Sequence, residues 1–362
     1  MSSGANRPAG AERSMTGNDV LTSVDSSPST NDIVEFVSRH YGLAVEVVKL
    51  SAERDDNYRI TAADGSQFLF KLAHSAEDPA VVDLQTKAFQ HVRAVTPSIW
   101  VQRLVPTIDG ALKTSLMAVH GRERLGWMLT YLAGVPLSCC GPTAEHAAQL
   151  GLIAAELDSA LHTFTHPAAA RGLLWDMQHA VQTRELLQYT HATSDRILGE
   201  QAIDTFERET APTLATLRTQ VIHNDLNPYN VIVNPIEPHQ ISGIIDFGDM
   251  VHAPLVNEVA VAAAYLVSVT DAPFGTVPSF VAAYHSRNPL KPEEIAVLPQ
   301  LIAVRQAIAI AITNWRASMY PENRDYILRN HDSALWGLRK LTAMGERRAR
   351  EQLMDACSGS VS

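Results

Sequence analysis

The chain has 362 residues, of which 46% are hydrophobic and 19% are charged, and its formal net charge is −10. This length and composition are typical of a globular protein with a substantial core, and they exclude a largely disordered or coiled-coil chain. The acidic balance, with no basic cluster before Arg347, argues against a nucleic-acid partner.

The cysteines and the apolar runs of the sequence indicate the cellular compartment of the protein. Cys139 and Cys140 are adjacent and only Cys357 stands apart, so no disulfide framework is expected. Residues 1–29 are rich in Ser, Gly, Asn and Asp, contain no apolar core of signal-peptide length, and are predicted to form a disordered tail. The most apolar later run, Val259 to Val267, is too short to span a bilayer. We therefore expect a soluble, cytoplasmic protein with no membrane partner.

Residues 30–132 are predicted to form a small lobe built on an antiparallel sheet. A first helix is expected to start near Ser29 or Thr30, because apolar residues from Ile33 to Tyr41 recur on one helical face. The elements that follow are strands from Val45 to Leu50, Tyr58 to Ala62 and Gln67 to Leu72, and a helix from Pro79 to Val95. The apolar run from Trp127 to Leu132 ends at Ala133-Gly134 and reads as a hinge between lobes.

Residues 133–355 are predicted to form a second, mainly helical lobe. Leu150, Ile153, Leu157 and Leu161 recur at helical spacing behind a plausible Thr143 cap. Two later stretches, Pro299 to Trp315 and Asp332 to Leu341, are also apolar on one helical face, and residues 356–362 are expected to be frayed. The fold class is therefore α+β, with a bilobal arrangement like that of protein kinases.

Two short motifs carry the chemistry. His223-Asn224-Asp225-Leu226-Asn227-Pro228-Tyr229-Asn230 fits H-x-D-x-x-x-x-N, and Ile245-Asp246-Phe247-Gly248 follows it, each motif beside strand-like apolar residues. Such a pair is typical of phosphoryl transfer, which needs a group that accepts the hydroxyl proton and hard oxygen ligands for Mg²⁺. We assign the first role to Asp225 and the second to Asn230 and Asp246, with His223 bracing the loop. Each motif alone would read as an ordinary turn.

Other residues are candidates for holding a nucleotide. Lys71, in an apolar strand of the first lobe, is expected to bind the α- and β-phosphates, although a surface-facing lysine is the ordinary alternative. Ser51 and Asn57 flank the hairpin that would cover the phosphates, where a plain polar turn explains the composition equally well. The backbone of Thr130, Tyr131 and Leu132 would face the purine edge of ATP or GTP.

The surroundings of the motifs distinguish this chain from protein kinases. Asn224 stands where an Arg is usual, and Gln85 stands where a Glu usually pairs with the strand lysine, with Asp83 and Glu77 as possible replacements. After Gly248 the chain passes directly into an apolar helix from about Leu255, so no long peptide-docking segment is present. This arrangement argues for a small-molecule acceptor.

At these residues the chain resembles the aminoglycoside phosphotransferase and choline kinase superfamily, and it is most similar to hydroxylysine kinases and to the phosphotransferase domains fused to class III aminotransferases. The resemblance covers roughly residues 32–345. It implies Mg²⁺, ATP or GTP as donor, and a small amino alcohol or amino acid as acceptor, with 5-hydroxylysine favoured. Asp249, Asp176 and Trp175 are the candidates for contacting that acceptor, although turn capping is the alternative for Asp249 and ordinary packing is the alternative for Trp175. An aminoglycoside, choline, ethanolamine or homoserine kinase, or a nucleotide-binding pseudokinase, remain the alternatives.

Overall fold

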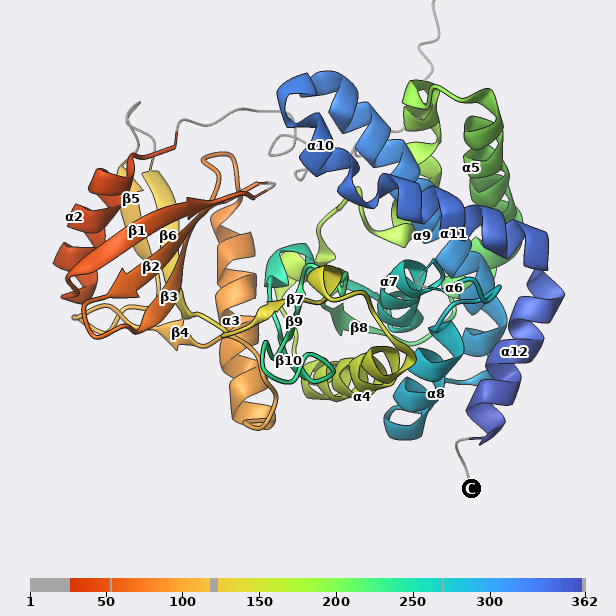
Figure 1. Ribbon diagram of the computed structural model, residues 1–362, viewed down its shortest axis with the longest axis horizontal. Helices are drawn as coiled ribbons and strands as arrows, with labels where there is room; N and C mark the ends of the chain where they lie inside the picture. The colour runs from red at the N-terminus through yellow and green to blue at the C-terminus, as the bar shows by residue number, and fades with distance from the viewer. Residues whose placement is uncertain (1–26, 53, 118–122, 269, 360–362) are drawn as a thin grey trace, which may run out of the picture.

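The computed structural model describes residues 27–52, 54–117, 123–268 and 270–359, and it has two lobes (Figure 1). The first lobe is a twisted antiparallel sheet with one helix on each side, and the second consists mostly of helices. The α+β, bilobal fold class expected from the sequence is therefore confirmed.

The first lobe contains a six-stranded sheet in the order β1-β2-β3-β6-β4, with β5 paired to β6. Its strands are β1 (Val45–Leu50), β2 (Asp56–Ala62), β3 (Gln67–Leu72), β4 (Leu104–Val105), β5 (Thr114–Met117) and β6 (Glu123–Thr130). A tight turn joins β2 to β3, in which Gly65 adopts a φ of 84° and Asp64 accepts a hydrogen bond from the Ser66 backbone N–H. The register places Asn57 opposite Lys71, so both lie near the same end of the hairpin.

Helix α2 (Thr30–Tyr41) covers the outer face of this sheet. Ser29 and Asp32 form a reciprocal capping box that fixes its start, as the sequence indicated. Ile33, Val37 and Tyr41 pack against buried sheet residues in a separate small core. The predicted disordered tail is too long at its end, because Ser27 already donates a hydrogen bond to Asp56. Residues 1–26 lie outside the described residues.

Helix α3 (Pro79–Val95) stands between the sheet and the second lobe (Figure 1). Asp78 caps it and Pro79 occupies its first turn, which suits a residue without a backbone N–H. Its buried face includes Val82, Gln85 and Phe89, and this face turns toward the space between the lobes. The chain leaves the first sheet at Thr130, and the next strand, β7, already pairs with a strand of the second lobe.

Two small sheets in the second lobe carry the motifs, one in the order β10-β9-β7 and the other β11-β8. Their strands are β7 (Val135–Pro136), β8 (Thr219–Ile222), β9 (Val231–Val233), β10 (Ile241–Ile244) and β11 (Val251–Pro254). The Asp225 loop therefore connects β8 to β9, and Asp246 follows β10.

The helices of the second lobe surround these strands. They are α4 (Ala144–Leu161), α5 (Thr193–Thr205), α6 (Ala211–Leu214), α7 (Val256–Leu266), α8 (Val277–Arg287), α9 (Pro292–Met319), α10 (Arg324–Ile327), α11 (His331–Met344) and α12 (Glu346–Ser358), and a run of 3₁₀ turns spans Met177–Tyr189. Thr143 caps α4 as predicted. The frayed end expected at residues 356–362 is wrong for its first part, because α12 continues to Ser358 and buries Cys357. Residues 360–362 lie outside the described residues.

Helix α9 crosses the centre of the second lobe. It starts seven residues before the predicted Pro299, because Pro292 occupies its first turn and the Glu294 carboxylate accepts a hydrogen bond from the Lys291 backbone N–H at 2.7 Å. Its length and mean hydropathy of 1.9 would suit a membrane span, but 83% of its most apolar window is buried within the molecule. It is therefore a core helix, and most of its side chains pack against neighbouring helices.

Candidate active site

Buried polar contacts hold the loop between β8 and β9. Asn224 turns the chain with a φ of 64°, in the left-handed region that Asn tolerates better than most residues. Its backbone N–H donates to Oε2 of Glu258, 2.9 Å away in the first turn of α7. His223 Nδ1 accepts from the Asp225 backbone N–H at 3.2 Å, and Nε2 donates to the Ile245 carbonyl at 3.1 Å. Burial lowers the pKa of His223 to about 4, so a neutral imidazole braces the loop.

Asp225 is oriented by two amides of its own loop. Its Oδ1 accepts from Asn227 Nδ2 at 2.8 Å, and its Oδ2 accepts from Asn230 Nδ2 at 2.6 Å. Burial and the nearby Asp249 carboxylate raise the pKa of Asp225 well above its usual range, against the opposing charge of Arg305. A carboxyl group with a raised pKa is a better proton acceptor at neutral pH than an ordinary one.

Asn230 and Asp246 supply oxygens that fit a hard cation. The Asn230 amide donates to Asp225, which leaves its Oδ1 for another partner. Asp246 adopts a φ of 66°, and its carboxylate accepts from the Gly248 backbone N–H at 3.2 Å. No group of three His, Cys, Asp or Glu able to hold a metal occurs among the described residues. One carboxylate and one amide oxygen fit Mg²⁺, which usually keeps water and phosphate oxygens as its other ligands.

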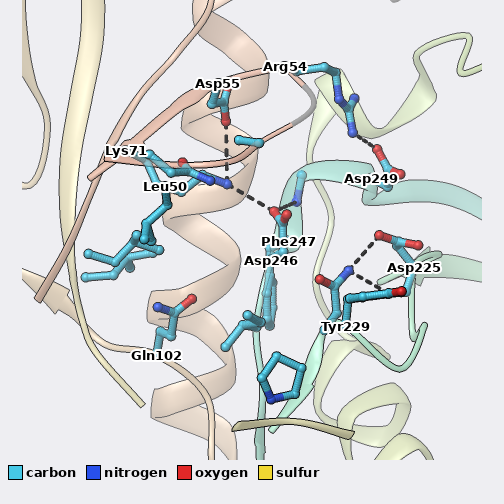
Figure 2. Close-up of a pocket in the computed structure, with 18 of the residues that line it drawn as sticks. Leu50, Arg54, Asp55, Lys71, Gln102, Asp225, Tyr229, Asp246, Phe247 and Asp249 are labelled. Carbon is cyan, nitrogen blue, oxygen red and sulfur yellow. Dashed lines mark hydrogen bonds and ion pairs between the residues drawn. The ribbon is translucent and has the colours of Figure 1, made fainter. Parts of the chain in front are cut away.

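Lys71 points toward Asp246 from the first lobe (Figure 2). Its Nζ lies 3.0 Å from Asp246 Oδ1 and 3.4 Å from Asp55 Oδ2. Burial acts to lower the pKa of Lys71, but these two carboxylates outweigh it and raise the pKa. Burial likewise acts to raise the pKa of Asp246, but Lys71 outweighs it and the value falls to about 2. Both groups are therefore charged at neutral pH.

The acidic partner of Lys71 comes from the β1–β2 hairpin rather than from α3. Gln85, at the position usually occupied by Glu, is buried beside the same cavity. Asp83 instead pairs with Lys87 at 2.7 Å. The acidic partner of Lys71 is thus Asp55, which was not among the residues predicted for this role.

The cavity between the lobes has a volume of about 330 Å³, within the range of roughly 300–1,000 Å³ for small-molecule sites. We call it the nucleotide cavity. The predicted residues that line it are Ser51, Asn57, Lys71, Tyr131, Leu132, Asp225, Asn230, Asp246 and Asp249. Residues from both lobes and from both motifs are therefore brought together around one space.

Thr130 does not take its predicted place. It does not line the nucleotide cavity, and its carbonyl accepts a hydrogen bond from Gln102 Nε2 at 3.1 Å. Its backbone N–H donates to the Arg103 carbonyl at 2.8 Å, so both backbone groups are already bonded within the lobe. The Tyr131 N–H also has a partner, the Gln67 carbonyl at 3.2 Å. Gln102 itself lines the cavity and faces it in Figure 2.

Asp249 lies where the lobes meet. Its carboxylate is paired with the guanidinium of Arg54, which reaches across from the β1–β2 hairpin (Figure 2). Asp249 lines the nucleotide cavity and also a second, adjoining one. The hairpin is thus attached to the second lobe by Arg54 and Asp249, beside the link from Asp55 through Lys71 to Asp246.

The second cavity, with a volume of about 60 Å³, adjoins Asp225 on the side of α9, and we call it the acceptor cavity. It is lined by Trp175, Asp225, Asn227, Asp249, Tyr265, Arg305, Ala309, Thr313, Arg316, Tyr326, Ile327, Arg329 and Asn330. Trp175, a candidate for contacting the acceptor, lines this cavity, and the Arg305 guanidinium carbon lies 4.8 Å from the centroid of its ring.

Asp176 does not take the predicted place. It lines neither cavity, and its carboxylate accepts from the backbone N–H of Gln178 at 3.0 Å and from Gln178 Nε2 at 2.9 Å. It caps the run of 3₁₀ turns that starts at Met177.

Sequence reasoning missed the residues whose position depends on distant parts of the chain. Arg54 and Asp55 lie in a hairpin that was considered only for its polar character. Arg305 lies inside an apolar helix, and a charged residue within such a helix was the one available signal. Glu258 lies in the first turn of α7, and its contact with the Asp225 loop depends on the packing of that helix.

Comparisons with known proteins agree with this geometry. The model of the phosphotransferase enzyme family matches residues 46–295, more than half of the chain. The chain is 26% identical to the hydroxylysine kinase of Mus musculus over 97% of its own length and 96% of that protein. Among solved structures, a microcompartment-associated aminopropanol kinase has a TM-score of 0.67 and 20% identity, covering 90% of this chain and 98% of its own. Amicoumacin kinase, in complex with AMP-PNP and Ca²⁺, has a TM-score of 0.62 and 15% identity, covering 83% of this chain and 93% of its own. The chain thus belongs to the phosphotransferase enzyme family and is a small-molecule kinase of the protein-kinase-like fold.

Proposed function

We propose that this protein transfers the γ-phosphoryl group of ATP or GTP, in the presence of Mg²⁺, to the side-chain hydroxyl of a small amine or amino acid, with a hydroxylysine-like acceptor favoured. The observation that carries the proposal is the position of Asp225, which lines both the nucleotide cavity and the acceptor cavity. A proton acceptor at the junction of two cavities suits transfer between two bound substrates. The similarity to hydroxylysine kinases over nearly the whole chain supports the choice of acceptor.

Polar residues of the nucleotide cavity have specific roles in this reaction. Lys71 would exchange its contact with Asp246 for the α- and β-phosphates, and Asn230 and Asp246 would hold Mg²⁺. When bound, Mg²⁺ supplies positive charge to the β- and γ-phosphates. The paired Asp55 keeps Lys71 directed into the cavity before the nucleotide binds.

The transfer itself is a single displacement at phosphorus. The acceptor oxygen forms a bond to the γ-phosphorus while the bond to the β–γ bridging oxygen breaks, and the nucleoside diphosphate leaves. The hydroxyl proton passes to Asp225, whose raised pKa favours this acceptance. Asn227 and Asn230 hold the Asp225 carboxylate in one orientation during the step.

A cytoplasmic location is part of the proposal. The cysteines Cys139, Cys140 and Cys357 are all free thiols, which suits a reducing compartment. Localisation of the tagged full-length chain in its host tests this point.

A substrate screen tests the proposed function. Purified protein is incubated with Mg²⁺, with ATP or GTP, and with 5-hydroxylysine, homoserine, choline, ethanolamine or an aminoglycoside, and nucleoside diphosphate release is measured. We expect release above the acceptor-free blank with 5-hydroxylysine and no antibiotic resistance in cells that express the chain. Release with none of the acceptors would instead favour a nucleotide-binding pseudokinase.

A further inference from the structure

Arg305 is a buried cation whose hydrogen-bonding capacity is largely unused. Only 2% of the residue is exposed, and it lines the acceptor cavity from α9. Its Nε and Nη1 atoms are buried without a hydrogen-bond partner in the part of the chain that the structure describes. Burying an unpaired donor is costly, and burying it on a charged group is more so. Such a side chain in a cavity wall indicates an anionic ligand that completes its bonds.

Asp225 does not fill this role. The nearest approach between the two groups is 4.0 Å, from Arg305 Nη2 to Asp225 Oδ1, which is longer than a hydrogen bond. Both Asp225 oxygens are already bonded to Asn227 and Asn230. Arg305 therefore lies beside the proton acceptor without being its direct partner.

Trp175 fixes the direction in which Arg305 presents its donors. The guanidinium carbon lies 4.8 Å from the centroid of the Trp175 ring. This cation–π contact gives neither Nε nor Nη1 of Arg305 a hydrogen-bond acceptor. The N–H groups of a guanidinium match the two oxygens of a carboxylate.

A second buried arginine lies on the same side of α9. Arg316 follows Arg305 by eleven residues, which is close to three full helical turns, so the two project from one face. Both line the acceptor cavity, together with the intervening Ala309 and Thr313.

Arg329 adds a third cation, with its guanidinium carbon 4.2 Å from the centroid of the Tyr229 ring. The cavity wall therefore combines three arginines with the carboxylates of Asp225 and Asp249, whereas a polyamine antibiotic would need a broadly acidic wall.

We propose that Arg305, assisted by Arg316, binds a carboxylate of the acceptor, so that the acceptor is a hydroxylated amino acid rather than an amino alcohol or an aminoglycoside. This inference rests on the proposed function and narrows its substrate class. The carboxylate completes the bonds of Arg305 and places the remainder of the acceptor beside Asp225. An acceptor without a carboxylate leaves Nε and Nη1 of Arg305 without hydrogen-bond partners in a buried site, and a site of that kind discriminates strongly against such analogues.

Matched pairs of compounds that differ by one carboxylate test the proposal in the wild-type protein. The pairs are L-threonine with 1-aminopropan-2-ol, L-homoserine with 3-aminopropan-1-ol, and 5-hydroxy-L-lysine with 1,5-diaminopentan-2-ol. Their binding to the full chain with Mg²⁺ and ADP is measured by titration calorimetry. We expect at least one amino acid to bind roughly 10–100-fold more tightly than its partner. Equal or weaker binding of the amino acid in all pairs, or no binding by any amino acid, overturns the proposal.

Substitution of Arg305 assigns the discrimination to this residue. Arg305→Met should reduce the affinity of the preferred amino acid to that of its amino alcohol and leave the amino alcohol unchanged. Arg347→Met, at a side chain on α12 that is 93% exposed, is the matched control and should keep wild-type affinities. Equal losses of affinity for the amino acid and its amino alcohol would mean that Arg305 does not bind the carboxylate. If Arg305→Met fails to fold, Arg305→Lys serves instead; because it keeps the charge but loses the paired donors, it should lower the affinity of the amino acid by a smaller factor and again leave the amino alcohol unchanged.

The binding experiment separates this inference from the proposed function. An amino acid that binds through Arg305 but yields no phosphorylated product would contradict the phosphotransfer and leave the carboxylate site standing. Phosphorylation of an amino alcohol as efficiently as its amino acid partner would support the phosphotransfer and overturn the carboxylate site.

Discussion

At the scale of single residues, Asp225 has the most demanding position. It must accept a proton while it lies close to Asp249, to Arg305 and to the expected phosphates. Its two amide partners and its place between the cavities explain how one carboxylate meets these demands. The motif identified Asp225 from sequence because its spacing to Asn230 is local. Arg305 could not be found in that way, because its place beside Asp225 depends on the packing of α9.

Replacing Asp225 should separate chemistry from binding. Asp225→Ala should lower kcat by about 10²–10⁴-fold, the usual effect of losing a positioned acid or base. Nucleotide affinity should change little, because Lys71 and Asp246 remain. Steady-state kinetics and nucleotide titration measure the two effects, and near-normal turnover in the folded variant would remove Asp225 from the mechanism.

Glu258 gives a pH-dependent prediction. Burial raises the pKa of Glu258 from 4.5 to about 7, so the folded protein retains a proton that the unfolded chain releases in this window. The unfolding free energy contributed by this group therefore falls as the pH rises through the window. Glu258→Gln removes the titration and keeps an oxygen for the Asn224 N–H. As the pH rises from about 5 to about 7, the unfolding free energy of this variant should increase relative to that of wild type by at most about 1.4 kcal/mol per pH unit.

Urea denaturation at about pH 5 and about pH 7 measures this difference. The same stability difference between Glu258→Gln and wild type at both pH values would show that Glu258 does not carry a raised pKa. Glu258→Ala, which also loses the oxygen acceptor, should additionally lower kcat through displacement of the Asp225 loop.

At the scale of elements, the β1–β2 hairpin connects the two lobes. It carries Arg54, paired with Asp249, and Asp55, which reaches Lys71. The strands were predictable because alternating apolar residues are a local signal. The partners of the hairpin were not predictable, because they lie in the other lobe. The place of Thr130 was missed for the same reason, since Gln102 comes from a different segment.

A double-mutant cycle tests the hairpin contact. Arg54→Ala, Asp249→Ala and the double variant should show a coupling energy of about 0.5–3 kcal/mol in unfolding, because the two side chains are largely buried where they meet. Lys49→Ala and Asp56→Ala provide a comparison pair within the hairpin region that does not cross to the second lobe. Strict additivity of Arg54→Ala and Asp249→Ala would show that the contact does not hold the lobes together.

At the scale of the whole molecule, the nucleotide cavity is formed jointly by both lobes. A ligand that binds there should stabilise their association, by about 2.7 kcal/mol when its concentration is 100 times its Kd. Mg²⁺ with ATP or GTP should therefore raise the Tm of the wild-type chain. EDTA or Asp246→Ala should abolish the metal-dependent part of this shift, and an unchanged shift in both cases would argue against the assigned metal ligands.

The bilobal plan was predictable because its helices and strands have strong local periodicity and the motifs resemble those of a known superfamily. The acceptor side was less predictable, since the acceptor cavity joins residues from Trp175 to Asn330 that no short motif connects. The comparisons identify the family, and the two cavities around Asp225 explain how its chemistry would be performed here.

Transfer to an acceptor hydroxyl at Asp225 is the central claim, and ³¹P NMR of the reaction products tests it most directly. With Mg²⁺, ATP or GTP and 5-hydroxy-L-lysine, the wild-type chain should produce a phosphate monoester signal together with the nucleoside diphosphate, and Asp225→Ala should produce neither at a comparable rate. Nucleoside diphosphate with free inorganic phosphate and no monoester, or equal monoester formation by Asp225→Ala, would contradict the account.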